Sequence, residues 1–274
     1  MIGAIIGDIV GSVYEFDGIK TKEFPLFGER RGKCCRFTDD SAMTLAVAGA
    51  LIDFAGEGGS LSNCAVKWMQ TVGRKYRNCG YGGTFIRWLA AANPRPYNSF
   101  GNGSAMRVSP AAWAAESLEE ALRFSDAVTA VTHNHPEGMK GARAVTACIF
   151  LARMGEDKET IRDHVRKHYY PLTETLAEIR PGYSFDVTCQ GAVPQAIQAF
   201  LEAESFEDAV RNAVSLGGDS DTQAAIAGSI AGPYFGIPAD LRRKALSYLP
   251  EDLTEILLTF EGLYGANRKP ETGA

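Results

Sequence analysis

Two stretches of the sequence place carboxylates and hydroxyls at the start of small, apolar helical runs. One stretch covers residues 37–41 and leads into 42–52, and the other covers 215–222 and leads into 223–232. An acid at a helix start is an ordinary capping residue, but two close carboxylates repel each other unless a cation lies between them. If both starts converge, their oxygens suit two divalent cations, Mg²⁺ or Mn²⁺, or else Ca²⁺. The predicted metal ligands are Thr38, Asp39, Asp40, Asp219, Asp221 and Thr222.

Capping without any metal is the alternative explanation of each stretch. Either stretch alone is explained about as well by capping as by metal binding, because Asp and Thr are both favoured at helix starts. The two together exceed what capping needs, since Asp39-Asp40 is a doubled acid and Asp219-Ser220-Asp221-Thr222 follows two glycines. The second stretch is not an EF-hand, because it lacks that loop's third acid, central glycine and final Glu.

Small residues on the two helical runs lead us to expect that these helices pack closely against each other. They are Ala46, Gly49 and Ala50 on the first run and Ala224, Ala227, Gly228 and Ala231 on the second. A third buried helix is predicted over 1–13, where Gly3, Gly7 and Gly11 form a stripe that lets a neighbouring backbone come close. Glu15 lies one helical step further along this stripe and is either exposed at a frayed end or an inward ligand.

The remainder of the chain is predicted to be helical, with no alternating strand pattern longer than a few residues. Capping signals or apolar periodicity predict helices over 61–74, 85–89, 121–131, 137–154, 159–169, 193–203, 209–214, 239–248 and 253–264. Residues 17–35 are polar and broken by Gly and Pro, which indicates a surface loop that could cover the acidic stretches. No linker divides the chain, so we expect a single compact, orthogonal all-α domain over residues 1–274.

Glycine loops precede two further helical segments. They cover residues 78–84 and 98–104, and the second is followed by Ala105-Met106-Arg107-Val108. Backbone N–H groups at such a junction suit a phosphate, although glycine turns before helices are common and neither loop matches the P-loop or dinucleotide fingerprint. His133 and His135 follow another predicted helix, where C-terminal capping explains them better than ligand binding.

Bulk composition restricts the class of protein. The 274 residues carry a net charge of −5, so there is no basic signal for a nucleic-acid partner. Six cysteines without a C-x-x-C spacing indicate reduced thiols and a cytoplasmic protein, and we expect a monomer. The apolar start lacks the positive residues and cleavage pattern of a secretion signal, and no apolar run is long enough to span a bilayer.

Taken together, five motifs resemble those of the ADP-ribosylglycohydrolase family. They occur in the family's order between the first residues and about Gly236: Gly7-Asp8 to Glu15, Phe37 to Asp40, Gly101 to Arg107, Thr132-His133, and Gly217 to Thr222. The resemblance implies an all-α fold with two metal ions. It also implies an enzyme that hydrolyses the bond between ADP-ribose and an acceptor, either a protein side chain such as arginine or serine or another ADP-ribosylated group.

The resemblance further implies roles for single residues. Glu15, Asp39 and Asp40 match the acids of metal binding and catalysis. Substrate contacts are implied for Gly82, Gly83, Gly101, Asn102, Gly103, Ser104, Met106, His133 and Tyr183, with residues 101–104 holding the diphosphate. Arginine-specific members carry an acid near the loop that matches residues 81–84, and this sequence has none there, which leaves the acceptor open.

Two alternatives to a hydrolase belong to other classes of protein. An ADP-ribose-binding module would keep the phosphate loop without turnover, and a structural protein would use the acids only as helix caps. Intact acids in both stretches favour a hydrolase, because binding alone would not need them all. Metal titration separates the structural protein from the other two, and release of free ADP-ribose separates the hydrolase from the binding module.

Overall fold

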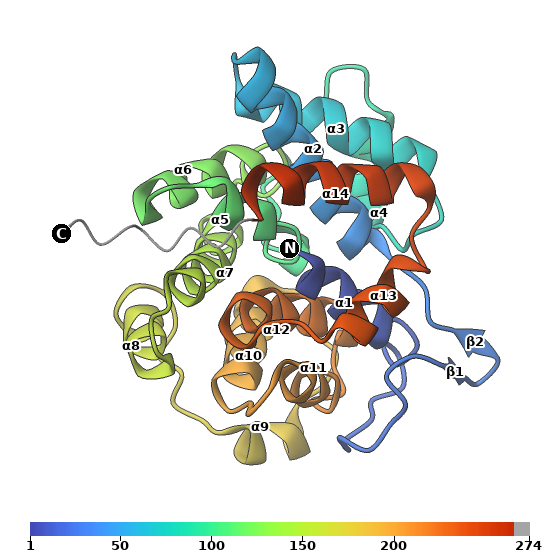
Figure 1. Ribbon diagram of the computed structural model, residues 1–274, viewed down its shortest axis with the longest axis vertical. Coiled ribbons are helices and arrows are strands. Elements are labelled where there is room, and N and C mark those ends of the chain that lie inside the picture. Colours follow the sequence, from blue (N-terminus) through green and yellow to red (C-terminus); the bar gives the residue numbers. More distant parts are fainter. Residues whose placement is uncertain (266–274) are drawn as a thin grey trace.

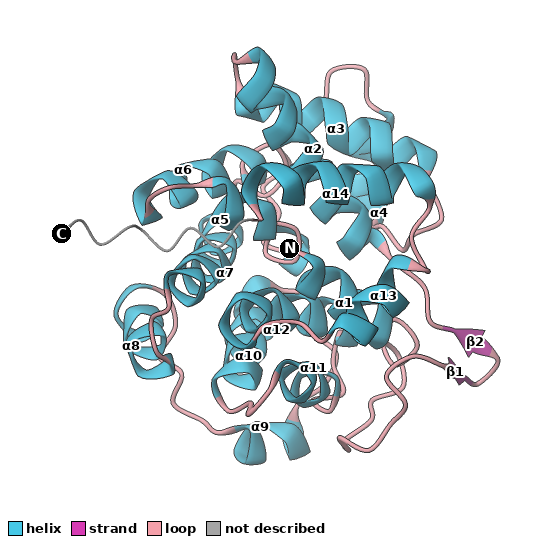
Figure 2. Cartoon of the chain, viewed as in Figure 1, coloured by secondary structure: helices cyan, strands magenta, loops and turns pink. Residues whose placement is uncertain are grey.

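A computed structural model describes residues 1–265, which fold into helices and one short hairpin (Figures 1 and 2). The helices are α1 Ile2–Gly11, α2 Asp39–Glu57, α3 Leu61–Lys75, α4 Gly83–Ala90, η1 Asn102–Ser104, α5 Ser109–Ala114, α6 Leu118–Thr129, α7 Pro136–Met154, α8 Lys158–His168, α9 Leu176–Gly182, α10 Cys189–Leu201, α11 Phe206–Val214, α12 Ser220–Phe235, α13 Ala239–Leu246 and α14 Glu251–Tyr264. The strands β1 Glu29–Arg30 and β2 Lys33–Cys34 pair antiparallel. The predicted all-α class is confirmed, and residues 266–274 of the predicted domain lie outside the described residues.

The central feature of the fold is the direct contact between the backbones of α1 and α12. All ten residues of α1 are buried, as are residues 220–231 of α12. A Cβ at Gly3 would lie 2.2 Å from the carbonyl oxygen of Gly228, and one at Gly7 would lie 2.0 Å from that of Ala224. The glycine stripe predicted in α1 is therefore what allows the two helices to approach so closely.

The predicted packing of α2 against α12 along their small residues was wrong. α12 lies along α1, whereas α2 lies mainly along α3. Gly49 of α2 faces the ring of Trp68 on α3, where a Cβ would approach the indole to 2.6 Å. Small residues predict a close neighbour but not which helix provides it, so only the starts of α2 and α12 meet.

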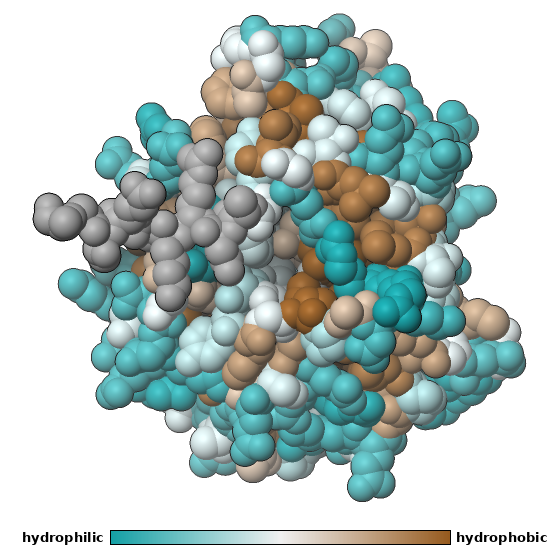
Figure 3. Space-filling model, viewed as in Figure 1, coloured by the Kyte–Doolittle hydropathy of each residue, from teal (hydrophilic) through white to brown (hydrophobic). Residues whose placement is uncertain are grey.

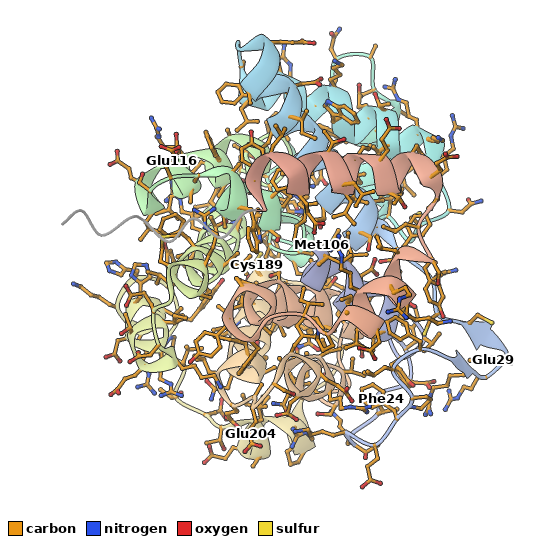
Figure 4. All side chains as sticks on the ribbon, viewed as in Figure 1. Phe24, Glu29, Met106, Glu116, Cys189 and Glu204 are labelled. Carbon is orange, nitrogen blue, oxygen red and sulfur yellow. The ribbon has the colours of Figure 1, made fainter. Side chains whose placement is uncertain are left out.

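Three groups of helices surround the centre of the molecule. Figure 1 shows α1, α10, α11 and α12 in its lower half, with α2, α3, α4 and α14 above them and α5 to α8 on the left. Met106, labelled near the centre of Figure 4, links α2 to α12, because its carbonyl oxygen accepts from Thr44 of α2 and its sulfur lies 3.8 Å from the hydroxyl oxygen of Thr222 on α12.

Local sequence explains where most helices begin. Side chains of Ser60, Ser117, Asp157, Thr188 and Ser205 accept hydrogen bonds from the exposed N–H groups of the helices that follow them. These are the residue types that favour N-cap positions. The capping signals and periodicity used above accordingly place α7 and α8 within one residue of their observed bounds.

Three segments differ from expectation. Residues 102–104 form a 3₁₀ turn and the next α-helix begins only at Ser109, so the second glycine loop does not lead directly into a helix. Helix α9 was not predicted; it is seven residues long and contains Pro181. The hairpin of β1 and β2 interrupts the surface loop predicted over 17–35.

The surface facing the viewer in Figure 3 is mostly hydrophilic, with hydrophobic side chains gathered around α14. Leu258 and Leu263 are the exposed large apolar residues of that helix. Within the described part of the chain, none of the helices has the length and hydropathy required to cross a membrane.

Candidate active site

The starts of α2 and α12 converge, as the acidic stretches predict. Thr222 donates its hydroxyl to the Oδ2 atom of Asp40 at 3.2 Å, across 182 positions of sequence. Carboxylate oxygens lie within 4.8 Å of one another in two sets, Asp8, Asp40 and Asp221, and Glu15, Asp219 and Asp221. Asp221 belongs to both sets, so the acids form one continuous cluster.

Capping does not account for these acids. Thr38 is the N-cap of α2, and its hydroxyl accepts from the backbone N–H of Asp40. The carboxylates of Asp39 and Asp40 are therefore not used as caps. Asp219 is at the N-cap of α12 but makes no side-chain capping bond; its Oδ2 accepts from the Asn102 amide at 2.7 Å. The buried Oδ1 of Asp40 has no partner within the described residues. A buried acceptor without a donor is costly, which points to a bound cation.

Asp8 is a site residue that sequence reasoning did not single out. It is fully buried in α1 and accepts four hydrogen bonds, from the backbone N–H and hydroxyl groups of Thr38 and Ser41. These bonds fix the first turn of α2 against α1. The available signal was an acid in a helix whose other residues are all apolar or glycine.

Burial raises the pKa of every acid in the cluster, and mutual repulsion adds to this for the acids other than Asp8. Desolvation is the main cause for Asp39, Asp40 and Asp221, followed for the first two by the charge of Asp221 and for the third by that of Asp219. The pKa of Asp219 rises to about 6 and that of the half-buried Glu15 to about 8, again chiefly through desolvation. Among residues 1–265, no Lys or Arg forms an ion pair with these acids. The carboxylates of the cluster therefore have no directly paired cation.

The donor set fits divalent metal ions. It consists of carboxylates and one hydroxyl with no thiolate or imidazole, which suits Mg²⁺ or Mn²⁺ better than Zn²⁺. Asp40, Asp219 and Asp221 have oxygens free to ligate, with Glu15 and Thr222 beside them. Thr38 was also predicted as a metal ligand, but its hydroxyl donates to Asp8 Oδ1 at 2.6 Å instead of pointing to a cation.

The acids line one end of a cavity of about 420 Å³, a size typical of small-molecule sites. Predicted site residues on its wall are Glu15, Asp39, Asp40, Gly82, Gly83, Gly101, Asn102, Gly103, Met106, His133, Asp219, Asp221 and Thr222. Asn102 joins the acidic end to the glycine loop through its bond to Asp219. The loop is held by Val187, whose carbonyl accepts from the backbone N–H of Asn102 at 2.8 Å.

Two predicted substrate contacts do not line this cavity. The hydroxyl of Ser104 bonds the carbonyls of Gly101 and Gly138 instead. The ring of Tyr183 packs on Gly218, and its hydroxyl donates to the carbonyl of Gly191 and accepts from the Gln223 amide. Both side chains support the loops that carry other site residues.

The two histidines after α6 have different positions. His133 lines the cavity and is buried. Its backbone N–H donates to the carbonyl of Thr129 at the end of α6. His135 is the N-cap of α7, where its ring accepts from the backbone N–H of Glu137, so the C-terminal capping expected for it was wrong. Proline at the first position of α7 explains why that helix begins there.

Hydrogen bonds to other parts of the chain hold the loop over 17–35 outside the cavity. Lys20 donates to the carbonyls of Tyr183 and Leu216, and Arg211 of α11 holds those of Lys22 and Phe24. None of residues 17–35 lines the cavity, so the covering role considered for this loop is not seen.

Comparison with known proteins agrees with this geometry. A family model described as ADP-ribosylglycohydrolase matches residues 1–271. The chain is 28% identical to the ADP-ribosylarginine hydrolase Tri1 of Pseudomonas putida, over 86% of this chain and 70% of that protein. It is 25% identical to ADP-ribosylhydrolase ARH3 of Homo sapiens, over 92% and 90% of the two chains.

Further similarity extends to a third curated relative and to a solved structure. The chain is 25% identical to the ADP-ribosyl-[dinitrogen reductase] glycohydrolase of Rhodospirillum rubrum, over 86% of this chain and 84% of that protein. A solved structure titled ADP-ribosylglycohydrolase-related protein complex superposes with a TM-score of 0.70 at 24% identity, covering 96% and 95% of the two chains, which shows the shared fold. Because the family model spans nearly the whole sequence, the chain belongs to the ADP-ribosylglycohydrolase family.

Proposed function

We propose that this protein is a metal-dependent hydrolase that cleaves the glycosidic bond between ADP-ribose and an acceptor and so reverses ADP-ribosylation. The observation that carries the proposal is the buried acidic cluster at one end of a cavity whose other wall is a glycine loop. Family membership supports the same reaction class.

The reaction replaces the bond from the anomeric carbon to the acceptor with a bond to water. Its transition state resembles an oxocarbenium ion, so negative groups near the ribose stabilise it. One proton leaves the attacking water and one joins the departing acceptor. Two divalent cations, when bound, would hold the ribose hydroxyls and lower the pKa of that water.

Glu15 is our leading candidate for the proton transfers. It follows α1 in a turn, stays partly exposed on the cavity wall and lies within 4.8 Å of Asp219 and Asp221. A carboxyl with a pKa of about 8 holds a proton near neutral pH, whereas a cation beside it would lower that value. Asp40 is only 3% exposed and Asp39 precedes it in the first turn of α2, a position that suits ligation better than proton exchange.

The composition of the cavity wall supports a proposal for the acceptor. Residues 80–85 contribute Gly80, Gly82, Gly83, Thr84 and Phe85, so no carboxylate is present there to bind a guanidinium. We therefore propose an uncharged acceptor, such as a serine oxygen or a nucleobase, ahead of arginine.

A single assay tests the activity and the acceptor together. The protein is incubated with Mg²⁺ or Mn²⁺ and with arginine-, serine- or nucleobase-linked ADP-ribose, and free ADP-ribose is measured. We expect release from an uncharged acceptor and none after chelation. Binding of ADP-ribose without release from any substrate would instead support the non-catalytic binding module, and release from the arginine linkage alone would overturn the acceptor proposal.

A further inference from the structure

Arg107 is a buried cation for which the proposed reaction has no use. It is 1% exposed, it follows η1, and it is the one Lys or Arg among the residues that line the cavity. No carboxylate within the described residues forms an ion pair with it, and its Nε has no partner. Burying an unpaired guanidinium costs free energy of folding, so we expect the contacts of Arg107 to have a functional role.

The main contact of Arg107 is a hydroxyl that also reaches the imidazole of the cavity. Its Nη2 donates to Thr132 Oγ1 at 2.6 Å, and the same oxygen lies 2.7 Å from His133 Nδ1. The opposite nitrogen of that ring, Nε2, faces the glycine loop, where a Cβ at Gly103 would lie 3.4 Å from it. Thr132 itself is fully buried.

The direction of these hydrogen bonds is set by the protons available and by the charge of Arg107. A guanidinium only donates, so Thr132 must accept from Arg107. The proton of Thr132 goes either to His133 Nδ1, at 2.7 Å, or to the Thr129 carbonyl, at 3.4 Å, in which case Nδ1–H donates to Oγ1 instead. The positive guanidinium beside Oγ1 repels an N–H dipole aimed toward it and attracts the lone pair of Nδ1, which favours Nδ1 as the acceptor. When Nδ1 accepts, the ring proton of a neutral imidazole is on Nε2.

We infer that Arg107 is a positioning residue that acts through Thr132 to hold His133 in the tautomer whose Nε2–H points into the cavity beside the glycine loop. This inference rests on the proposed function, because the oxygen that accepts from Nε2 belongs to the ADP-ribose, as a phosphate or hydroxyl oxygen. The imidazole is kept neutral, since desolvation and then the Arg107 charge hold its pKa well below the usual range. The donor is therefore present at any working pH.

The tautomer can be read in the free protein, without substrate or metal. Long-range ¹H–¹⁵N spectra distinguish the two neutral tautomers and the imidazolium; the chain has four histidines, and the spectrum of His133→Gln assigns the signal. We expect the Nε2–H tautomer between pH 6 and 8. Finding the Nδ1–H form or an imidazolium at pH 7 overturns the inference.

Variants of Thr132 test the relay. Thr132→Val should leave His133 in a mixture of tautomers and weaken ADP-ribose binding roughly tenfold, as expected for loss of one bond to a charged group. Thr132→Ser keeps the hydroxyl and should restore both readouts. Thr146→Val is the matched control, because Thr146 is equally buried and its hydroxyl has no partner.

The outcomes separate this inference from the proposed function. A wild-type tautomer in Thr132→Val together with wild-type affinity overturns the relay while leaving the hydrolase intact. If wild-type protein does not bind ADP-ribose at all, the proposed function fails, and the inference about its ligand fails with it even when the tautomer is as expected. Should Thr132→Val not fold, the wild-type spectrum and the serine variant still decide.

Discussion

Thr222 and Asp40 are hydrogen-bonded at 3.2 Å, although they belong to helices that otherwise hardly touch. The bond joins the starts of α2 and α12, and the cavity opens beside it. Everything proposed for catalysis depends on this junction, because it brings the two acidic stretches to one place.

Asp40→Asn and Asp221→Asn should abolish turnover without unfolding the protein. An amide keeps the shape but removes a charged ligand, so we expect a loss of activity on the order of a thousandfold. Thermal melting in excess Mg²⁺ or Mn²⁺ should show no metal stabilisation for either variant. Asp163→Asn, at an exposed position of α8, is the control and should behave as wild type.

Stability of the metal-free protein should fall as pH rises. The folded state holds protons on Glu15 and Asp219 up to pKa values of about 8 and 6, above their usual 4.5 and 3.8. Between these limits the folded chain binds more protons than the unfolded one, so each pH increase favours unfolding. We expect Tm to drop by roughly 5 °C between pH 5 and pH 8.

Divalent cations should reverse this trend, since they replace the protons that stabilise the acids. The gain in Tm on adding Mg²⁺ or Mn²⁺ should therefore increase with pH. A metal effect that is the same at pH 5 and pH 8 would contradict the coupling between proton release and metal binding.

Asp8→Ala should destabilise the first turn of α2. Two backbone N–H groups and two hydroxyls lose their acceptor, which we expect to cost roughly 3 kcal/mol in the free energy of unfolding. Asp8→Asn retains one acceptor oxygen and should lose less. Chemical denaturation of the metal-free forms measures both, and equal stability of the two variants would argue against the hydrogen-bonding role.

Gly7→Ala should be among the most damaging single-methyl changes. Its Cβ would meet the carbonyl of Ala224 at 2.0 Å, and backbone cannot move aside as a side chain can, so we expect a loss of about 3 kcal/mol or more. Gly56→Ala near the end of α2 meets nothing within 4 Å and should gain up to about 1 kcal/mol from helix propensity. Denaturant titration of the pair isolates the contact.

Local patterns in the sequence were enough for most of the helices and for the residues of the acidic cluster other than Asp8. Capping residues and apolar periodicity act within a few positions, which is why the bounds of α7 and α8 could be predicted closely. The two acidic stretches were recognisable because they carried more charge than caps require. Their convergence was predicted correctly, but for the wrong reason, since α1 rather than α2 lies along α12.

The parts that could not be predicted are contacts between distant segments. Asp8 bonds Thr38 and Ser41 from about thirty positions away, and no periodicity indicates that pairing. Tyr183 has an aromatic ring and a hydroxyl suited to contact a ligand. The hydroxyl is instead hydrogen-bonded to the Gly191 carbonyl and the Gln223 amide. The importance of Arg107 appears only once Thr132 and His133 are seen beside it.

The pairing of α1 with α12 has a consequence for biosynthesis. Residues 2–11 leave the ribosome well before residues 220–235, so the nascent chain carries a helix that is apolar apart from Asp8 before its neighbour α12 has been made. Until α12 is made, other parts of the chain or a chaperone must cover the apolar surface of this helix. The acidic cluster, which needs both helices, is thus completed only after α12 has emerged from the ribosome.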